Sequence, residues 1–263
     1  MNDERSCGPL VATCRWKHTD GAAARELPLV ANLWIRLELA QCGRCRIDTR
    51  QLNMAMAGDL AFQCQCSAVQ GKLRNASRGA NARFTCYCDD CQVLAHHLGH
   101  AALLDPNGGT DACHASTSQL EILQGTDHLA TLKVANRPLR PVLRWYCRAC
   151  STPLFNTYDN AKLALFGLIL ANTAPQQRDS LLGPSRGVIW RQFATGDLSA
   201  RKDANIAAIL IRLIGRQISA RFSGDWRGCP LFDQVSGASI VVPLQLSTDE
   251  RTAAQAAITS RAF

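Results

Sequence analysis

The spacing of hydrophobic and polar positions divides the chain into three stretches. Residues 1–53 show no clear period. Residues 54–158 contain short runs in which apolar and polar positions alternate, which is typical of strands with one buried face. Residues 159–263 carry longer apolar segments, some of them at helical spacing. The pattern predicts a mainly β domain at 54–158 and a C-terminal extension at 159–263 that is partly helical and packs on the core.

The strand pattern is clearest near the end of the middle stretch. "LEIL" at 120–123 and "HLATLKV" at 128–134 flank a short polar "QGTD", which predicts an antiparallel hairpin. "PVLRWYC" at 141–147 predicts a further strand.

Two helices are predicted. The first lies in "DDCQVLAHHLGH" (89–100), with Asp89 or Asp90 as its N-cap. The second lies in "KDANIAAILIRLIGRQISARF" (202–222), with Asp203 as a candidate N-cap. We expect the second helix to pack on the core with its arginines in solvent. The alternative is an amphipathic helix that lies on a membrane surface.

The run that begins at Met54 reads like a second start of the chain, with Met56 as another candidate initiator. We therefore expect residues 1–53 to be a poorly ordered or spurious extension that the fold does not need. The alternative is a capping segment in which Cys42 and Cys45 bind metal, because they have Cys-x-x-Cys spacing.

Charge and composition exclude several classes of protein. The net charge of +8 is scattered rather than gathered in a dense basic run, which disfavours nucleic-acid binding. The first thirty residues contain no apolar segment typical of a secretory signal, and "LALFGLILA" (163–171) is far shorter than the roughly 20 residues of a membrane span. We therefore expect a cytoplasmic protein, in which thirteen cysteines favour bound metal over disulfides.

Seven of the cysteines form three clusters with chelating spacings. They are a first pair, a central triplet and a last pair: Cys64 and Cys66; Cys86, Cys88 and Cys91; Cys147 and Cys150. The central triplet is close enough in sequence to hold one ion alone, so the two pairs must combine. The division predicts two Zn²⁺ ions, one in a closed structural Cys₄ site and one in a Cys₃ site that leaves a fourth position for water or substrate. An iron–sulfur cluster and buried free thiols are the alternatives, and we expect the isolated Cys113 and Cys229 to be packing residues.

The three clusters also carry a family resemblance. "CQCSAVQG" (64–71), "CYCDDC" (86–91) and "WYCRACSTPLFNT" (145–157) resemble the superfamily of glutathione-dependent formaldehyde-activating enzymes and centromere protein V proteins. The resemblance implies a β-tent, an arrangement of coiled β-sheets stapled by zinc. It also implies that the two pairs hold a structural zinc and that the central triplet holds a catalytic one.

The chain departs from the family pattern at three notable positions. Ser67 and Ser151 stand where the family usually has glycine, and Gln92 stands where it often has arginine. These changes put glutathione in doubt more than zinc. The long extension resembles a bacterial subgroup of unknown function that shares "CYCDDCQ".

The resemblance implies carbon–sulfur chemistry of the S-(hydroxymethyl)glutathione synthase type, in which a small thiol such as glutathione adds to formaldehyde or the adduct breaks down. We assign proton transfer to Tyr87 or His97. The other nearby candidates are Asp89, Asp90, His96 and His100, and we expect the two aspartates to act as helix caps.

The sequence thus predicts a zinc-dependent carbon–sulfur lyase or thiol-adduct enzyme whose exact substrate stays open. The alternatives are a non-catalytic zinc scaffold for a protein or nucleic-acid partner, and a metal or thiol sensor. A protein side chain such as His96 on the central metal would favour the scaffold.

Overall fold

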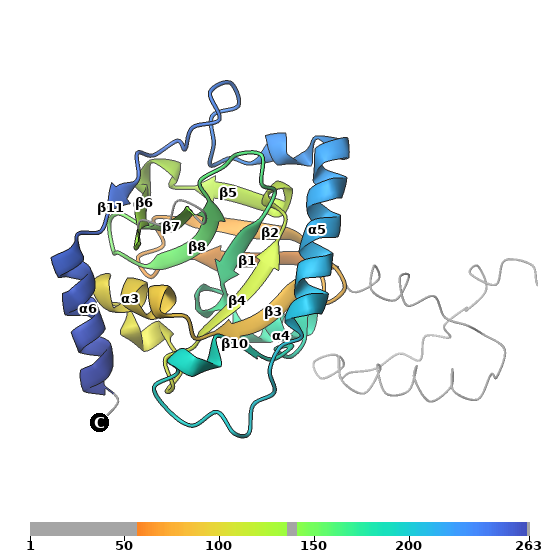
Figure 1. Cartoon of the computed structure of the whole chain (residues 1–263). Coiled ribbons are helices and arrows are strands. Elements are labelled where there is room, and N and C mark those ends of the chain that lie inside the picture. The colour runs from red at the N-terminus through yellow and green to blue at the C-terminus, as the bar shows by residue number, and fades with distance from the viewer. Residues whose placement is uncertain (1–56, 136–140, 262–263) are drawn as a thin grey trace, which may run out of the picture. The chain divides into compact units, whose positions relative to one another are not determined.

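The strands in the described part of the chain form two sheets, seen in Figure 1. The structure, a computed structural model, describes residues 57–135 and 141–261, which lie within the unit Asp48–Phe263. The larger sheet has eight strands in the order β10-β3-β4-β9-β8-β7-β6-β11. Its inner strands are antiparallel, whereas β10 and β11 pair in parallel with β3 and β6. In that order the strands are Val188–Ile189, Ala82–Cys86, Thr110–Ala115, Phe166–Ile169, Pro153–Tyr158, Val142–Cys147, Leu129–Lys133 and Leu244–Gln245.

The smaller sheet packs against the larger one through an aromatic core. Its strands are β1 (Gly58–Gln63), β2 (Gln70–Ala76) and β5 (Leu120–Gln124). Phe62 of β1 meets Phe155 of β8 edge to face, with ring centroids 5.9 Å apart. Trp145 of β7 is fully buried in the same core and donates its indole N–H to Thr157 Oγ1 at 2.9 Å. Burial of each large apolar side chain contributes about 2–3 kcal/mol, so this core holds the two sheets together. The predicted mainly β fold with a helix-containing C-terminal part is confirmed.

The hairpin predicted around "QGTD" is wrong. β5 pairs with β2, and β6 pairs with β7, so the two segments belong to different sheets. Gly125 lies between them at φ +77°, where an added Cβ would lie 2.0 Å from the carbonyl oxygen of Ala68. The close approach to Ala68 and the short helical turn Thr126–His128 direct the chain away from β5. Alternating patterns identified both strands but not their partners.

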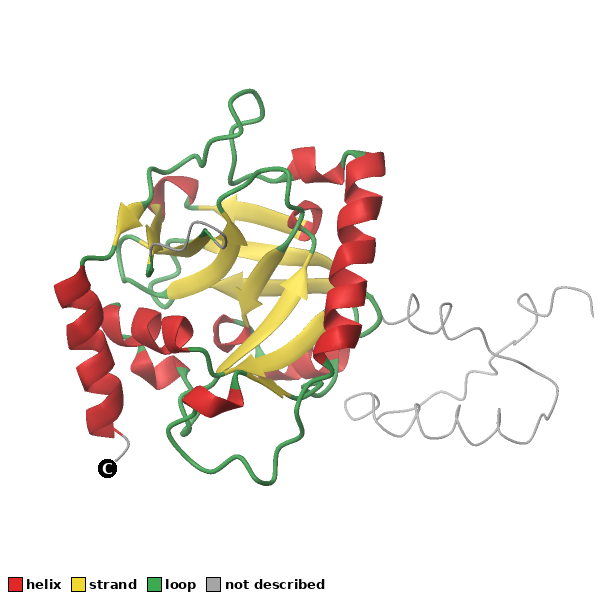
Figure 2. Cartoon of the chain, in the orientation of Figure 1, coloured by secondary structure: helices red, strands yellow, loops and turns green. Residues whose placement is uncertain are grey.

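Four α-helices in the described part of the chain surround the sheets, as Figure 2 shows. They are α3 (Asp89–His97), α4 (Pro175–Leu182), α5 (Ile206–Ser223) and α6 (Thr248–Arg261). The two helices predicted from the sequence are α3 and α5. Asn205, rather than Asp203, caps α5, because its side chain accepts a hydrogen bond from the amide of Ala208.

Helix α6 lies beside α3 at one edge of the molecule (Figure 1). Arg251 of α6 reaches the first turn of α3, where it donates to Asp89 and Asp90 at 2.9 Å each. Apolar side chains of both segments, including Leu94 and Ala254, pack in one cluster. The chain's C-terminal helix therefore supports the helix that carries part of the central triplet.

Helix α5 does not pack as expected. Its large apolar side chains face solvent, with Ile211 71% and Phe222 89% exposed. Its inward side instead carries Arg216, which donates to the carbonyl oxygen of Ala80, and Gln217, which accepts from the amide of Ala164. Hydrogen bonds to loop backbone, rather than an apolar stripe, hold this helix to the sheets.

No helix in residues 57–135 and 141–261 is both long and apolar enough to cross a membrane.

The fold leaves two predictions about the division of the chain untested. The predictions for residues 1–53, including a metal at Cys42 and Cys45, fall outside the described residues. The boundary at 158/159 stays a prediction, and β9 from the predicted extension lies between β4 and β8 in the larger sheet.

Candidate metal centres

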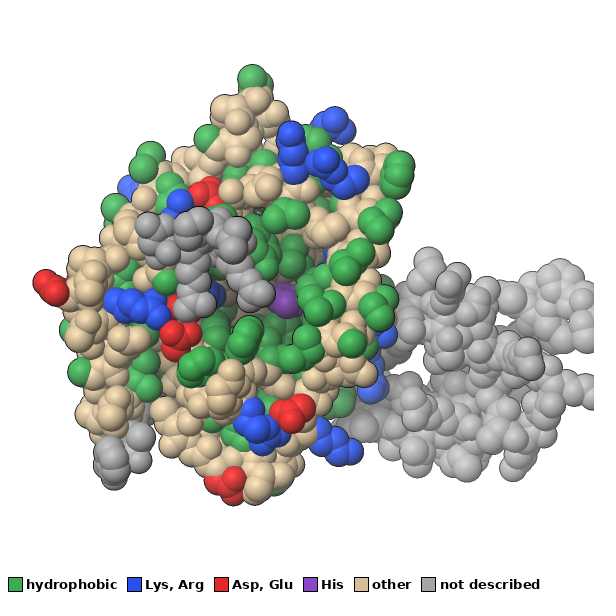
Figure 3. All heavy atoms as spheres, in the orientation of Figure 1, with side chains coloured by type: hydrophobic (Ala, Val, Ile, Leu, Met, Phe, Trp, Pro, Cys, Tyr) green, Lys and Arg blue, Asp and Glu red, His purple; other side chains and the backbone are tan. Residues whose placement is uncertain are grey.

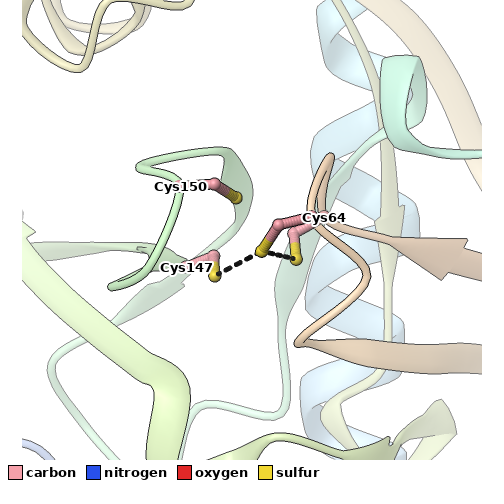
Figure 4. A group of neighbouring side chains, drawn as sticks. Cys64, Cys147 and Cys150 are labelled. Atoms are coloured by element: carbon pink, nitrogen blue, oxygen red, sulfur yellow. Dashed lines mark hydrogen bonds between the residues drawn. The ribbon is translucent and has the colours of Figure 1, made fainter.

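The first and last pairs of cysteines meet where strands of the two sheets end. Cys64 directly follows β1, and Cys147 is the last residue of β7. The Sγ atoms of Cys64 and Cys66 lie 3.4 Å apart, those of Cys66 and Cys147 lie 3.8 Å apart, and all four lie within 4.8 Å of one another. Figure 4 shows Cys64 and Cys147 reaching toward each other from separate loops, with Cys150 beside them. Zn–S bonds of about 2.3 Å in a tetrahedron separate sulfurs by about 3.8 Å, so this four-cysteine group can hold zinc.

Two tight loops present these thiols. The amide of Cys64 donates to the carbonyl oxygen of Val69, and the amide of Cys147 donates to that of Thr152, both at 3.0 Å. The Thr152 hydroxyl also accepts from the amide of Gln65 at 3.1 Å, which links one loop to the other. The loops therefore bring the pairs together without a direct strand pairing between β1 and β7.

Burial and hydrogen bonding affect the thiols of the last pair in opposite ways. Burial raises the pKa of Cys147 to about 12. Burial would also raise the pKa of Cys150, but hydrogen bonds from Thr152 and the loop backbone lower it to about 6. The surroundings therefore stabilise negative charge at Cys150, as a bound cation requires.

Both loops turn through a residue in the left-handed region. Ser67 has φ +60° and Ser151 has φ +58°, at the two positions where the resembling family usually has glycine. A non-glycine residue in this region costs about 1–2 kcal/mol.

We expect Ser67→Gly and Ser151→Gly each to raise the free energy of unfolding by about 0.5–1 kcal/mol, because the relief of strain exceeds the entropy that glycine loses on folding. The melting temperature of the zinc-loaded protein should rise by roughly 2–4 °C per kcal/mol. Ser77→Gly, at a buried serine without positive φ, is the matched control and should not stabilise. Equal or lower melting temperatures for both loop variants would contradict the strain argument.

The central triplet lies where β3 passes into α3. Cys86 ends β3, Cys88 is the N-cap of α3, and Cys91 lies in its first turn. Their Sγ atoms are 3.0 Å (Cys88 to Cys91) and 3.9 Å (Cys91 to Cys86) apart, and all lie within 4.8 Å. Among the described residues, no histidine, aspartate or glutamate joins this group as a fourth ligand.

The prediction that an aspartate caps α3 is wrong. Cys88 occupies the N-cap position, and Asp89 and Asp90 are the first two helical residues. Their negative charge is favourable in the first turn of a helix, and both bind Arg251 of α6. Their role in the structure is therefore to attach α6 to the triplet's helix.

A buried arginine faces the central triplet. Arg144 of β7 is 7% exposed, and its Nη1 lies 3.7 Å from Cys91 Sγ. Hydrogen bonds from Cys86 and Cys88, with the positive charge of Arg144, hold the pKa of Cys91 well below its usual range. A buried guanidinium requires a compensating negative charge. Three thiolates around Zn²⁺ carry a net charge of −1, which Arg144 balances, so these residues fit the metal.

The triplet borders a cavity of about 250 Å³ on the face seen in Figure 3, where apolar side chains surround a hollow with an imidazole inside it. Most of its wall is apolar or aromatic. The apolar residues that line it include Phe84, Ala112, Val142, Leu165, Ile189, Trp190 and Leu213.

A row of four residues crosses the sheet along the floor of this cavity. Arg144 of β7 pairs with Asn156 of β8, which pairs with Gly167 of β9, which pairs with His114 of β4. The Nδ1 atom of His114 and the Oδ1 atom of Asn156 are buried and have no hydrogen-bond partner among the described residues. Unpaired buried polar atoms cost about 1–3 kcal/mol each, so these two atoms weaken the fold unless a partner reaches them.

Burial lowers the pKa of His114 to about 4, with Arg216 contributing. The imidazole of an unfolded chain titrates near pH 6.5. Between pH 6.5 and 4, His114 is therefore protonated in the unfolded chain and neutral in the folded chain. Stability should therefore fall as the pH drops through this window, by about 3 kcal/mol in all.

The test compares unfolding free energies of the native protein and His114→Gln at pH 7.5 and 4.5. The variant lacks the titrating group and should lose about 2–3 kcal/mol less than the native protein. Loss of metal in acid affects both proteins equally, so it cancels in the comparison. Identical pH profiles would show that His114 is not buried as a neutral group.

Tyr87 and His97, predicted to move protons, do not line the cavity. The side chain of Tyr87 is fully buried in a separate cluster with Val188 and Leu198, and its hydroxyl donates to Asp105 at 2.6 Å. Burial and Asp105 raise the pKa of Tyr87. His97 is the last residue of α3. Their proposed catalytic roles stay untested predictions.

The remaining candidates have structural positions. His96 lies on α3 outside the triplet's ligand group. The Nε2 atom of His100 lies 2.7 Å from the carbonyl oxygen of Cys150, which links the end of α3 to the four-cysteine group. Cys113 and Cys229 are buried in the core, as predicted.

Sequence reasoning missed Arg144, Asn156 and His114. These residues lie on three strands, and the motifs offered a signal for one of them: Arg144 stands three residues before Cys147 in a strand whose other face is the buried Trp145. An arginine on the second face of a strand whose first face is buried needs a negatively charged partner if that face is also covered.

Comparison with known proteins gives a family and a distant structural neighbour. The family model described as "Family of unknown function (DUF6151)" matches residues 56–241, which include all seven cysteines and the polar row. A crystal structure of a Rhodobacter sphaeroides protein, a structural-genomics target, is 18% identical; the alignment covers 48% of this chain and 97% of that chain, with a TM-score of 0.33. No curated protein matches.

Proposed function

The chain belongs to DUF6151, a family of unknown function, and we propose that it is a zinc-dependent carbon–sulfur lyase or thiol-adduct enzyme whose reaction takes place at the central triplet. The proposal extends the resemblance to glutathione-dependent formaldehyde-activating enzymes. One observation carries it: a group of three cysteines, balanced by the buried Arg144, borders a cavity that is lined by His114 and Asn156, each with one buried polar atom that lacks a partner.

The two cysteine groups have different surroundings, which supports different roles. The four-cysteine group has a complete tetrahedral donor set and joins segments from both sheets. The central triplet provides three donors beside the cavity. A zinc ion there would supply a position for a substrate sulfur or oxygen and lower its pKa, as metal sites with three protein ligands do.

Side chains of the cavity floor would handle the proton. When a thiol adds to an aldehyde, a carbon–sulfur bond forms, the carbonyl π bond breaks, and the thiol proton ends on the oxygen. The neutral imidazole of His114 can accept that proton at Nδ1 and return it to the oxygen. In the reverse direction it removes the hydroxyl proton as the carbon–sulfur bond breaks.

Asn156 and Arg144 would orient the reacting groups. Asn156 lies between Arg144 and Gly167 in the row, and its free Oδ1 can accept a hydrogen bond from a hydroxyl group of an adduct. Arg144 favours the thiolate form of Cys91, the thiol nearest its guanidinium.

Exchange NMR of aldehydes mixed with thiols tests the proposal, since it measures formation and breakdown of the adduct at equilibrium. The native protein should accelerate exchange, His114→Gln should be slower by at least about tenfold, and Cys88→Ser should be inactive. Cys229→Ser removes a buried thiol outside both groups and is the matched control.

If the native protein exchanges no thiol faster than Cys88→Ser, and no thiol changes the visible spectrum of cobalt-substituted protein, the enzyme proposal fails. A non-catalytic zinc scaffold then becomes the better account.

A further inference from the structure

The cavity beside the central triplet has walls that select for apolar ligands. Its sides are formed by aromatic and branched side chains, and the ring of Phe84 lies edge to face with the imidazole of His114 at 4.5 Å. An apolar cavity of about 150 Å³ is enough to bind benzene. The volume of about 250 Å³ therefore accommodates a ring with a short linker.

Charge distribution argues against glutathione as the occupant. Among the described residues that line the cavity, Arg144 is the side chain with a permanent charge, and it faces the thiols of the triplet. Glutathione carries two carboxylates and an ammonium group. A buried carboxylate without a partner costs several kcal/mol, and the described residues of the lining offer no second cation to bind one.

We infer that the thiol or thiol adduct handled at this site is uncharged and carries a hydrophobic group of about the size of an aromatic ring. This inference rests on the proposed function for its sulfur, but the shape and charge of the cavity carry the choice of organic group. The sulfur would lie toward Cys91, the ring beside Phe84, and a hydroxyl or carbonyl oxygen near Asn156 and His114.

Gly167 provides a way to fill the cavity. It lies in the floor row between Asn156 and His114, and a Cβ built there has van der Waals contacts of 3.7 Å to His114 and 3.9 Å to Asn156. Valine suits a strand and adds two methyl groups beyond that Cβ, so Gly167→Val should fold and occupy the space of a ligand. Gly228→Val, at a glycine with open space around it, is the matched control.

The experiment titrates benzyl mercaptan, glutathione and benzyl alcohol into native, Gly167→Val and Gly228→Val proteins. Calorimetry and Trp190 fluorescence report occupancy of the cavity, and the spectrum of cobalt-substituted protein reports sulfur at the metal. Benzyl mercaptan should bind native protein at least tenfold more tightly than glutathione, and benzyl alcohol should compete with it. Gly167→Val should weaken benzyl mercaptan at least tenfold, while metal content and the Gly228→Val protein stay unchanged.

The outcomes separate this inference from the proposed function. If glutathione binds as tightly as benzyl mercaptan, or if Gly167→Val leaves benzyl mercaptan binding unchanged, the inference is overturned while the enzyme proposal stands. If both benzyl ligands bind in the cavity and no thiol perturbs cobalt, the apolar site is supported and the enzyme proposal fails.

The exposed face of α5 supports a second, independent inference. The side chains of Ile206, Leu210, Ile211, Ile214, Ile218 and Phe222 are each more than half exposed. Figure 3 shows apolar side chains along this helix. Exposed apolar patches of this kind mark interaction sites.

Charge identifies the kind of surface that α5 fits. Between Ile206 and Ser223 the helix exposes Arg212 and Arg221, while Arg216 points inward, and it contains no acidic residue. An apolar stripe with arginines and no acids complements an anionic lipid surface, whereas two copies of the helix would repel each other. We propose that α5 binds the surface of anionic membranes, with its apolar side chains in the headgroup region.

Flotation with vesicles of phosphatidylcholine, with or without phosphatidylserine, tests this. The full chain should float with the anionic vesicles, less so at high salt, and Ile211→Glu should reduce binding at least tenfold. Val235→Glu, which changes an exposed valine outside α5, should bind like the native protein. No flotation would overturn the proposal. A dimer that Ile211→Glu dissociates would identify a second copy as the occupant, and cross-links to residues 1–56 would identify that segment.

Discussion

Cys147→Ser should unfold the protein under conditions in which Cys88→Ser leaves it folded. The four-cysteine group joins the end of β1 in one sheet to the end of β7 in the other, so its metal closes contacts between residues more than eighty positions apart. The central triplet closes a loop of only a few residues between β3 and α3. Binding at a structural zinc site is coupled to folding, with apparent free energies of about 10–16 kcal/mol in small zinc domains.

Elemental analysis and thermal melts measure the difference. Native protein should contain two zinc ions per chain. Cys88→Ser should contain one and keep a cooperative melt at a lower temperature, because loss of the central zinc removes the charge that balances Arg144, whereas Cys147→Ser and Cys64→Ser should aggregate or lose cooperative unfolding. Cys229→Ser should retain both ions. Equal destabilisation by Cys88→Ser and Cys147→Ser would mean that both groups are structural, and an iron–sulfur absorbance would replace zinc altogether.

Arg144→Met should remove the central zinc and spare the other. Methionine has a similar length but no charge, so three thiolates and Zn²⁺ would leave a buried charge of −1 without a partner. Breaking a buried ion pair in this way costs about 3–5 kcal/mol. The affinity of the triplet for zinc should therefore fall by about a hundredfold or more.

Competition with a chelator measures that affinity, and Arg144→Lys, which keeps the charge, should recover part of it. If the cysteines were neutral free thiols, the carboxylate of Asp90, which also binds Arg251, would be the charge left to offset Arg144. Arg144→Met would then raise stability, since it removes a desolvated cation. A more stable Arg144→Met protein would thus refute the metal at the triplet.

The cysteine groups could be predicted because their chemistry is local. Cys86, Cys88 and Cys91 lie within six positions, and each outer pair occupies one tight loop, so spacing alone limits which sulfurs can meet. The period of two identified strands such as β7, and the apolar run at 202–222 identified α5. Each of these properties depends on neighbours a few residues away.

Three features depend instead on which distant segments lie together. Alternation in 120–134 marks two strands but does not name their partners, so β5 and β6 enter different sheets. The apolar positions of α5 predict a face packed on the core, yet the hydrogen bonds of Arg216 and Gln217 turn that face to solvent. The pair Asp89 and Asp90 received its partner, Arg251, from the far end of the chain.

The surroundings of the triplet also depend on which distant segments lie together. Arg144, Asn156, Gly167 and His114 are separated by 53 positions in the sequence, and strand register alone places them in one row. Local spacing is encoded in the covalent chain, so seven thiols could be divided into two groups from their positions. The charge, the polar atoms and the apolar walls around the triplet come from packing between strands, which depends on the free energy of the whole fold.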